Sequence, residues 1–137
     1  MNLSKEIKIV KLASSSTATT GTIESSPVDT TGYEGVLLFT CIKKADPTNV
    51  LKVQQGGRDL EGAAMVAQAD GQVVFVEVHQ PQTVQGKELR VVVERGVSTG
   101  VGEIYALLYN GRRRPELNAI EGPDGMIGIL LISPDVV

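Results

Sequence analysis

The sequence lacks most of the residues from which disulfides, metal sites and catalytic centres are built. It contains no tryptophan, one histidine (His79) and one cysteine (Cys41). A single cysteine excludes an internal disulfide, and it fits a chain made in a reducing cytosol. Because zinc needs several histidine, cysteine or carboxylate ligands, His79 and Cys41 are too few soft ligands to indicate such a site. We therefore expect no metal and no cofactor.

The sequence also lacks an excess of positive charge and a long hydrophobic run. Its formal net charge is −3 and its pI is about 5.1, so the chain as a whole does not attract nucleic acid or an anionic membrane. No apolar run approaches the roughly 20 residues that span a bilayer. Residues 1–6 lack the apolar centre of a signal peptide. We expect a soluble, unsecreted protein without nucleic-acid or membrane partners.

What the sequence does contain is a succession of β-prone runs. Hydrophobic residues make up 42% of the chain but aromatic residues only 4%, so the core must consist of valine, isoleucine, leucine and alanine. Stiff β-branched side chains suit a pleated sheet better than a helix. Seven short strands are predicted, at residues 5–12, 36–42, 51–55, 73–78, 89–94, 104–109 and 126–132. Turn signals separate them, which predicts an all-β fold, an antiparallel β-sandwich or jelly roll.

The length of 137 residues fits a single domain with terminal extensions. The Ser/Thr-rich residues 14–21 have the composition of a loop or linker. We therefore predict an N-terminal arm and linker at 1–21, a β-sandwich core at 22–115, and a C-terminal segment at 116–137 that is a last strand or an arm. Residues 5–12 are either a strand or an extended arm. Residues 60–68 are either a helical turn or a loop packed on the sheet.

One segment matches the motif of a hydrolase nucleophile. Gly96-Val97-Ser98-Thr99-Gly100 has the G-x-S-x-G pattern and follows a predicted strand. The nucleophile elbow needs a helix directly after it and a histidine later in the chain. Here a strand follows, and His79 precedes the serine. The segment is therefore predicted to be a flexible hairpin connection, and the protein not to be an enzyme.

The densest charge in the chain is the basic block Arg112-Arg113-Arg114. Arginine forks form paired hydrogen bonds with carboxylates, so the block suits an acidic protein surface. A solvated loop is the next alternative. Nucleic acid is the least favoured, because no aromatic residues are interleaved with the arginines and the net charge is negative.

Four stretches carry a resemblance to a known family. They are Asp29-Thr30-Thr31-Gly32-Tyr33-Glu34-Gly35-Val36, Leu51-Lys52-Val53-Gln54-Gln55, Leu89-Arg90-Val91-Val92-Val93 with Arg95-Gly96 and Ser98-Thr99, and Leu107-Leu108-Tyr109-Asn110-Gly111-Arg112-Arg113-Arg114-Pro115. In this order they resemble small virion proteins of tailed bacteriophages, the capsid decoration or cement proteins. The resemblance covers about residues 29–115.

The resemblance implies a non-enzymatic protein on the outside of a phage head, made in the cytoplasm of the bacterial host. Such proteins have jelly-roll or β-sandwich folds and clamp neighbouring subunits of the major capsid protein. A homo-oligomer, dimer or trimer, on a capsid symmetry axis is the expectation that goes with this. The alternative function is a carbohydrate- or receptor-binding β-sandwich of a phage tail or fibre, although the shortage of aromatic platforms weakens it.

Contacts with the capsid or with further copies are expected at the terminal segments and the basic block. Terminal β-prone segments can add a strand to a neighbour's sheet edge. The predicted contact residues are Ile7, Ile9, Val10, Leu12, Arg112, Arg113, Arg114, Ile127, Ile129 and Leu131.

Overall fold

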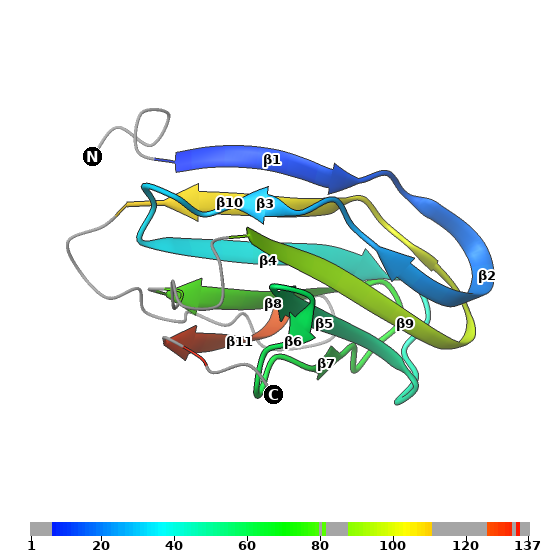
Figure 1. Ribbon diagram of the computed structural model, residues 1–137. Helices are drawn as coiled ribbons and strands as arrows, with labels where there is room; N and C mark the ends of the chain where they lie inside the picture. Colours follow the sequence, from blue (N-terminus) through cyan, green and yellow to red (C-terminus); the bar gives the residue numbers. More distant parts are fainter. Residues whose placement is uncertain (1–6, 80, 82–87, 111–125, 133, 135–137) are drawn as a thin grey trace.

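The described part of the chain folds into strands, turns and loops (Figure 1). The computed structural model describes residues 7–79, 81, 88–110, 126–132 and 134, and eleven strands and no helix occur among them. All described strand pairs but one are antiparallel, the exception being β8 with β11. The predicted all-β, antiparallel class is therefore confirmed. No helix of the described residues is long and apolar enough to cross a membrane.

Five strands form one layer of the structure. Their order across the layer is β1-β10-β4-β8-β11, with β11 parallel to β8. The bounds are β1 Ile7–Ala13, β4 Gly35–Ile42, β8 Gln72–His79, β10 Ile104–Tyr109 and β11 Met126–Ile132. Figure 1 shows these strands stacked from top to bottom behind the rest of the molecule.

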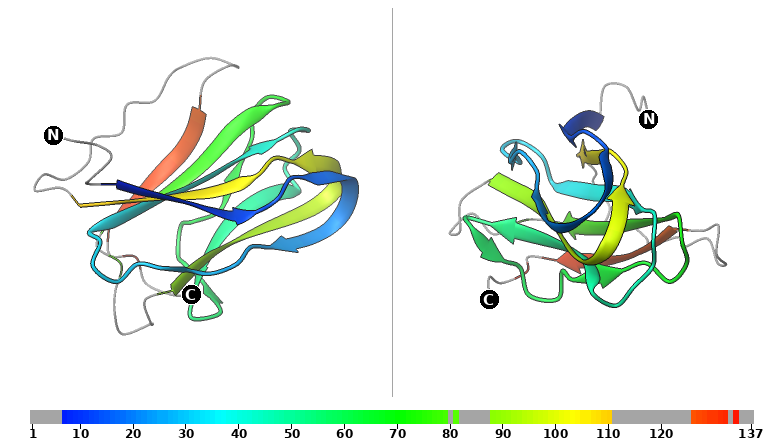
Figure 2. Two further views of the ribbon diagram at one scale, coloured as in Figure 1. Left: turned by 90° about the horizontal axis from the view of Figure 1, so that it is seen from above. Right: turned by 90° about the vertical axis from the view of Figure 1, so that its right-hand side faces the viewer.

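The remaining six strands form the second layer around the long strand β9. On one side of β9 lie β2 and β3, and on the other lies β5, which also pairs with β6 and β7. The bounds are β2 Ser16–Glu24, β3 Val28–Asp29, β5 Asn49–Gln55, β6 Arg58–Asp59, β7 Met65–Val66 and β9 Glu88–Val101. Strand pairing between the two layers occurs at Ile42 of β4 and Val101 of β9. There the sheet turns from one layer into the other (Figure 2).

The core lies between the two layers and is aliphatic, as the composition predicts. One row across the five-stranded layer shows how it is built: Val10 pairs with Ala106, Ala106 with Leu38, Leu38 with Val76, and Val76 with Ile129. All five belong to the hydrophobic core or pack against it. Side chains at every second position of β5 and β9 complete the core from the other layer: Leu51, Val53, Leu89, Val91 and Val93.

The Ser/Thr-rich stretch is not a linker, contrary to the sequence-based prediction. Ser16–Glu24 forms β2 and pairs with β9 from Ser16↔Val101 to Glu24↔Val92. The preceding strand β1 is part of the five-stranded layer, and its Leu12 is buried. Residues 7–24 therefore belong to the sheet rather than to an arm. Composition misled the prediction because the strand that holds β2 in place comes some 75 residues later in the chain.

The Gly-rich segment 96–100 also differs from its prediction. It continues β9 as a strand instead of connecting two strands. Gly96 lies so close to Thr48 that a Cβ atom here would overlap the threonine side chain. The glycine allows β9 to approach the turn that precedes β5, which is a packing role. Because the strand runs on through Ser98, the strand-to-helix turn of a nucleophile elbow is not formed.

Two open alternatives are resolved. Residues 60–68 contain no helix; they form a loop that buries Leu60, Ala63 and Ala67 and places the short strand β7 beside β5. Within the segment 116–137, predicted to be a last strand or an arm, residues 126–132 form strand β11 beside β8.

Candidate functional site: the apolar face of the five-stranded layer

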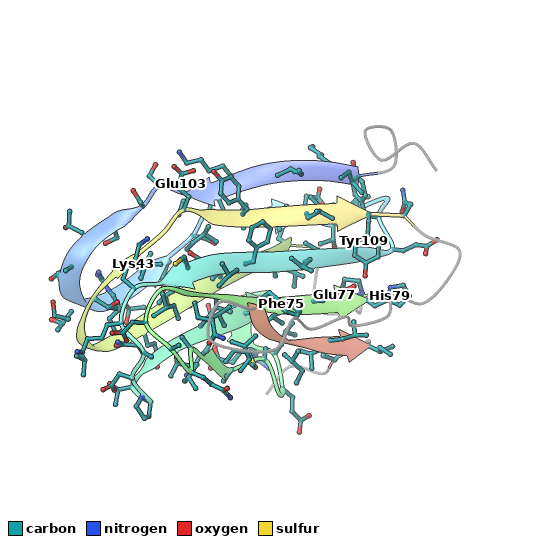
Figure 3. All side chains as sticks on the ribbon, turned by 180° about the vertical axis from the view of Figure 1, so that it is seen from behind. Lys43, Phe75, Glu77, His79, Glu103 and Tyr109 are labelled. Carbon is teal, nitrogen blue, oxygen red and sulfur yellow. The ribbon has the colours of Figure 1, made fainter. Side chains whose placement is uncertain are left out.

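The outward side of the five-stranded layer carries few charged side chains, and we call it the apolar face (Figure 3). It is made of the residues that alternate with the core positions, so strand registry identifies them. Its apolar and aromatic members are Ile7, Ile9, Leu37, Phe39, Cys41, Val73, Phe75, Tyr105, Leu107, Tyr109, Leu130 and Ile132. Charged side chains at the outward positions are Lys11 and Glu77. Most of the apolar members are partly exposed, and the two large hydrophobic residues with the greatest exposure, Ile9 at 61% and Ile132 at 40%, both lie here.

The outward side of the second layer has the opposite character. Lys52 Nζ lies 3.1 Å from Glu94 Oε1 and 3.8 Å from Asp59 Oδ2, and Arg90 Nη1 lies 3.6 Å from Glu24 Oε2. These are half-exposed ion pairs of the kind that ordinary solvent-facing sheets carry. The contrast between the two outward sides is the most pronounced surface feature of the described residues.

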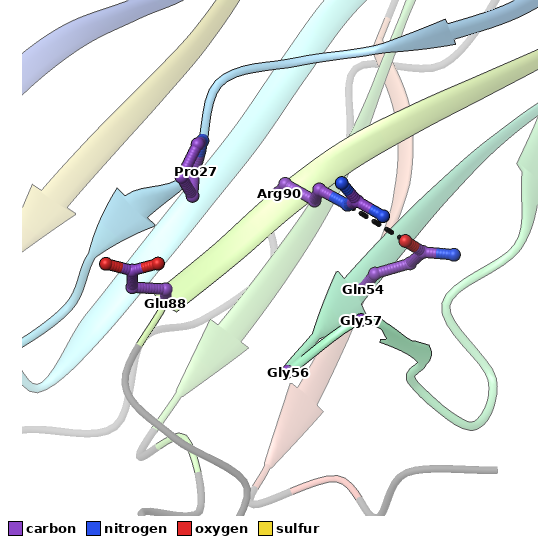
Figure 4. Close-up of a pocket in the computed structure, with 6 residues that line it drawn as sticks. All are labelled: Pro27, Gln54, Gly56, Gly57, Glu88 and Arg90. Carbon is purple, nitrogen blue, oxygen red and sulfur yellow. Dashed lines mark hydrogen bonds between the residues drawn. The ribbon is translucent and has the colours of Figure 1, made fainter.

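A shallow pocket lies on this polar side, where β3, β5 and β9 come together (Figure 4). Its volume is about 270 Å³, and Pro27, Gln54, Gly56, Gly57, Glu88 and Arg90 line it. Arg90 Nε donates to Gln54 Oε1 at 3.0 Å, and Gln54 Nε2 donates to Asp59 Oδ1 at 2.8 Å. Two lining side chains, Arg90 and Gln54, therefore bind each other, and no aromatic platform for a sugar ring lines the pocket.

Two aromatic rings lie flat on the apolar face, each over a glycine of the neighbouring strand. Tyr109 is paired in registry with Gly35, and Phe75 with Gly128. A Cβ atom at either glycine would overlap the ring that covers it. Aromatic side chains that cover a glycine on the next strand compensate for its missing side chain. Each ring thus fills the space that the missing side chain of its glycine leaves on this side of the sheet.

A buried polar cluster lies at one end of the apolar face. Tyr109 Oη donates to Glu77 Oε2 at 2.5 Å and lies 3.4 Å from His79 Nδ1. The rings of Tyr109 and His79 are stacked, with centroids 6.2 Å apart. Glu77 and His79 are 6% and 5% exposed although they belong to the outward side of the sheet. The hydrogen bond to Tyr109 gives the Glu77 carboxylate a partner that its burial requires.

This cluster predicts a loss of stability in alkaline solution. Burial, and then the hydrogen bond and charge of Glu77, raise the pKa of Tyr109 well above its ordinary value of 10.0. Since the folded chain holds this proton more tightly than the unfolded chain, the stabilisation is complete below about pH 10 and is lost as the pH rises further. The free energy of unfolding, measured in urea across this range, should fall with pH in the native protein. Tyr109→Phe should flatten that slope, whereas Tyr105→Phe should retain more of it; equal slopes in the native protein and in Tyr109→Phe would contradict the assignment.

The opposite end of the apolar face carries a second, exposed polar group. Glu103 Oε2 accepts a hydrogen bond from Tyr105 Oη and lies 3.7 Å from Lys11 Nζ. These two partners, the tyrosine first, lower the pKa of the Glu103 carboxyl. The positive charge of Lys11 is thereby compensated, and the middle of the face is left to Leu37, Phe39 and Leu107.

The predicted contact residues divide between the two sides of the sheet. Ile7 and Ile9 lie on the apolar face. The others within the described residues are turned inward, where Leu12 is buried and Val10, Ile127, Ile129 and Leu131 pack against the core. Arg112, Arg113 and Arg114 lie outside the described residues.

The sequence analysis missed the centre of the apolar face. Leu37, Phe39, Tyr105 and Leu107 lie in predicted strands but are not among the predicted contact residues. Their signal was present, because both strands are apolar at consecutive positions, and a strand needs only one of its sides for the core.

No three histidine, cysteine, aspartate or glutamate side chains of the described chain gather into a group that would hold a metal ion.

Comparisons with protein families, with curated proteins and with solved structures find no match for this chain. A function must therefore be argued from three observations: the apolar face, the polar outward side of the second layer, and the resemblance in sequence pattern.

Proposed function

We propose that this chain is a non-enzymatic structural protein of a bacteriophage virion. It binds the outside of the capsid, on the major capsid protein, and cements neighbouring subunits of the shell. In this proposal it is made in the cytoplasm of the bacterial host and acts on the head exterior as a homo-oligomer. The sequence resemblance supports this class of protein, and the apolar face supports a contact with another surface.

The observation that carries the proposal is the difference between the two outward sides of the sandwich. A polar, ion-paired side is well solvated by water. Covering an aliphatic and aromatic side with another surface removes it from water, which lowers the free energy of the complex. A decoration protein needs one surface of each kind, the apolar one toward the shell and the polar one toward solvent. The apolar face and the polar side of the second layer meet this requirement.

The filled glycine positions of the apolar face also support this role. Catalysis and small-ligand binding need a concave site with converging polar groups. Here the rings of Tyr109 and Phe75 fill the positions over Gly35 and Gly128, so that side chains close the surface. A broad apolar patch stabilises a complex in proportion to the area that the contact buries, which is how a cement protein adds strength at the boundary between shell subunits.

The test is binding to capsids that lack the protein, measured by co-sedimentation. Leu107 lies between Ile9 and Leu37 in the middle of the apolar face and is partly exposed. Leu107→Lys places a charge there that would have to lose its water on binding, so we expect the affinity to fall at least about tenfold. The substitution leaves the core positions of β10 unchanged, and a melting curve should show the fold retained.

Thr22→Lys is the matched control, because Thr22 is an exposed strand residue on the second layer. It should bind capsids like the native protein. Equal affinities of Leu107→Lys and the native protein would contradict the role of the apolar face. Loss of binding in Thr22→Lys alone would show that the opposite side contacts the shell.

A further inference from the structure

Strand β1 presents an open edge with an exposed isoleucine at its centre. It pairs with β10 on one side, and no described strand pairs with its other side. Free edges of sheets are usually protected by charge, proline or a bulge, because they bind other strands. β1 has no proline, its bulge lies only beyond Lys11, and of its two exposed lysines Lys11 is paired with Glu103. Ile9, at the middle of the strand, is 61% exposed.

The regular part of β1 is a five-residue segment centred on Ile9. Ile7–Lys11 pairs residue by residue with β10, from Ile7↔Tyr109 to Lys11↔Tyr105, and the register shifts only beyond Lys11. This segment is long enough and straight enough to bind a further strand through its backbone groups.

From these features we propose that β1 binds β1 of a second copy in antiparallel fashion, about a two-fold axis at Ile9. A two-fold axis perpendicular to the sheet brings the same edge of both copies together and keeps their apolar faces on one side. In this register Ile9 lies opposite Ile9 of the second copy, Lys8 opposite Val10, and Ile7 opposite Lys11.

Charge selects this register. Because side chains alternate between the two sides of a sheet, only registers that place a residue opposite its own copy keep the apolar sides together. An axis at Lys8 or at Lys11 would put lysine directly opposite lysine, which is unfavourable. An axis at Val10 would extend pairing into the irregular end of β1. The axis at Ile9 uses the whole regular segment and covers its most exposed apolar side chain.

The result is a ten-stranded sheet with one continuous apolar face. Ile9 of each copy then joins the row that runs through Leu107 and Leu37. The dimer doubles the surface available to a partner, but its formation needs no partner. It therefore holds whether or not the apolar face binds a capsid.

The first measurement is the mass of the full chain in solution, by light scattering over a concentration series. The native protein should form a dimer. Ile9→Lys removes the apolar contact and opposes two lysines, and should raise the dissociation constant at least about tenfold, or ~1.4 kcal/mol. Ile132→Lys is the matched control, since Ile132 is the exposed isoleucine at the opposite edge of the same layer. It should leave the dimer intact.

The second measurement does not depend on weakening the dimer. In a Cys41→Ser background, single cysteines are introduced in turn at Ile7, Lys8, Ile9, Val10 and Lys11 and then oxidised. Only the residue on the axis faces its own copy within disulfide distance, so Ile9→Cys should form by far the most covalent dimer. A native protein that stays monomeric at all concentrations overturns the proposal. So does a dimer weakened by Ile132→Lys as much as by Ile9→Lys, or strongest cross-linking at another position.

Discussion

Replacing Leu38 with alanine is expected to lower the free energy of unfolding by about 3–4 kcal/mol. Leu38 is fully buried in the middle of the five-stranded layer, between Ala106 and Val76 in registry. Alanine removes its buried apolar surface and leaves a cavity that the strands on both sides hold open. Against a typical total stability of roughly 5–15 kcal/mol, this loss is a large fraction. Urea unfolding followed by circular dichroism gives the measurement.

Leu37 is the matched control, because it is the same residue one position earlier on the opposite side of the same strand. Leu37 is partly exposed and belongs to the apolar face, not to the core. Leu37→Ala should cost about 1 kcal/mol or less, since a partly exposed side chain loses less on truncation. Equal losses for the two variants would contradict the division of β4 into a core side and a contact side.

The strands were predictable because their signal is local. Alternation and β-branched runs place β4, β5, β8, β10 and β11 within a residue or two of their predicted bounds. The turn before β5 follows its sequence too: Asp46 Oδ1 accepts from the backbone N–H of Thr48 at 2.8 Å, as an aspartate before a proline turn should. Local chemistry therefore determined most of the element list.

The two layers and their sides were not predictable to the same degree. A strand such as β10 is apolar at consecutive positions, so the sequence does not show which of its sides enters the core. For β11 the prediction chose Ile127, Ile129 and Leu131 as contact residues, and the structure turns them inward. Only the registry with the neighbouring strand β8 separates the sides. The apolar face therefore had to be recognised from the structure.

The wrong prediction for the Ser/Thr stretch has a different cause. This stretch is held in the sheet by a side chain that is distant in the sequence. β2 pairs irregularly with β9, with register shifts between Ser16 and Thr19 and between Thr19 and Gly21. Such bulges leave backbone carbonyls without ladder partners. A side chain with several donors can satisfy them, and that side chain is Arg95 of β9. Composition alone could not reveal this arrangement.

Arg95 is 9% exposed and is surrounded by neutral acceptors. Its guanidinium donates to five oxygen atoms of β2 and β9: Gly21 O at 2.9 Å, Ser16 Oγ at 3.1 Å, and the carbonyls of Thr17, Thr20 and Thr99 at 3.4 Å. In the described part of the chain no carboxylate forms an ion pair with it. The stability gained from this arginine therefore comes from hydrogen bonds that hold β2 on β9, rather than from charge pairing.

Replacing Arg95 with methionine is accordingly expected to lower the free energy of unfolding by about 3 kcal/mol, because methionine fills the space but supplies no donor. Arg90→Met is the control: Arg90 lies on the same strand, but its side chain is 34% exposed and its ion pair with Glu24 is on the surface. That variant should lose less than about 1 kcal/mol. Urea unfolding compares the two, and hydrogen exchange should show the amides of β2 opening far more readily in Arg95→Met. If the two variants were equally stable, or if β2 stayed protected without Arg95, β2 would be held by its backbone pairing with β9 alone.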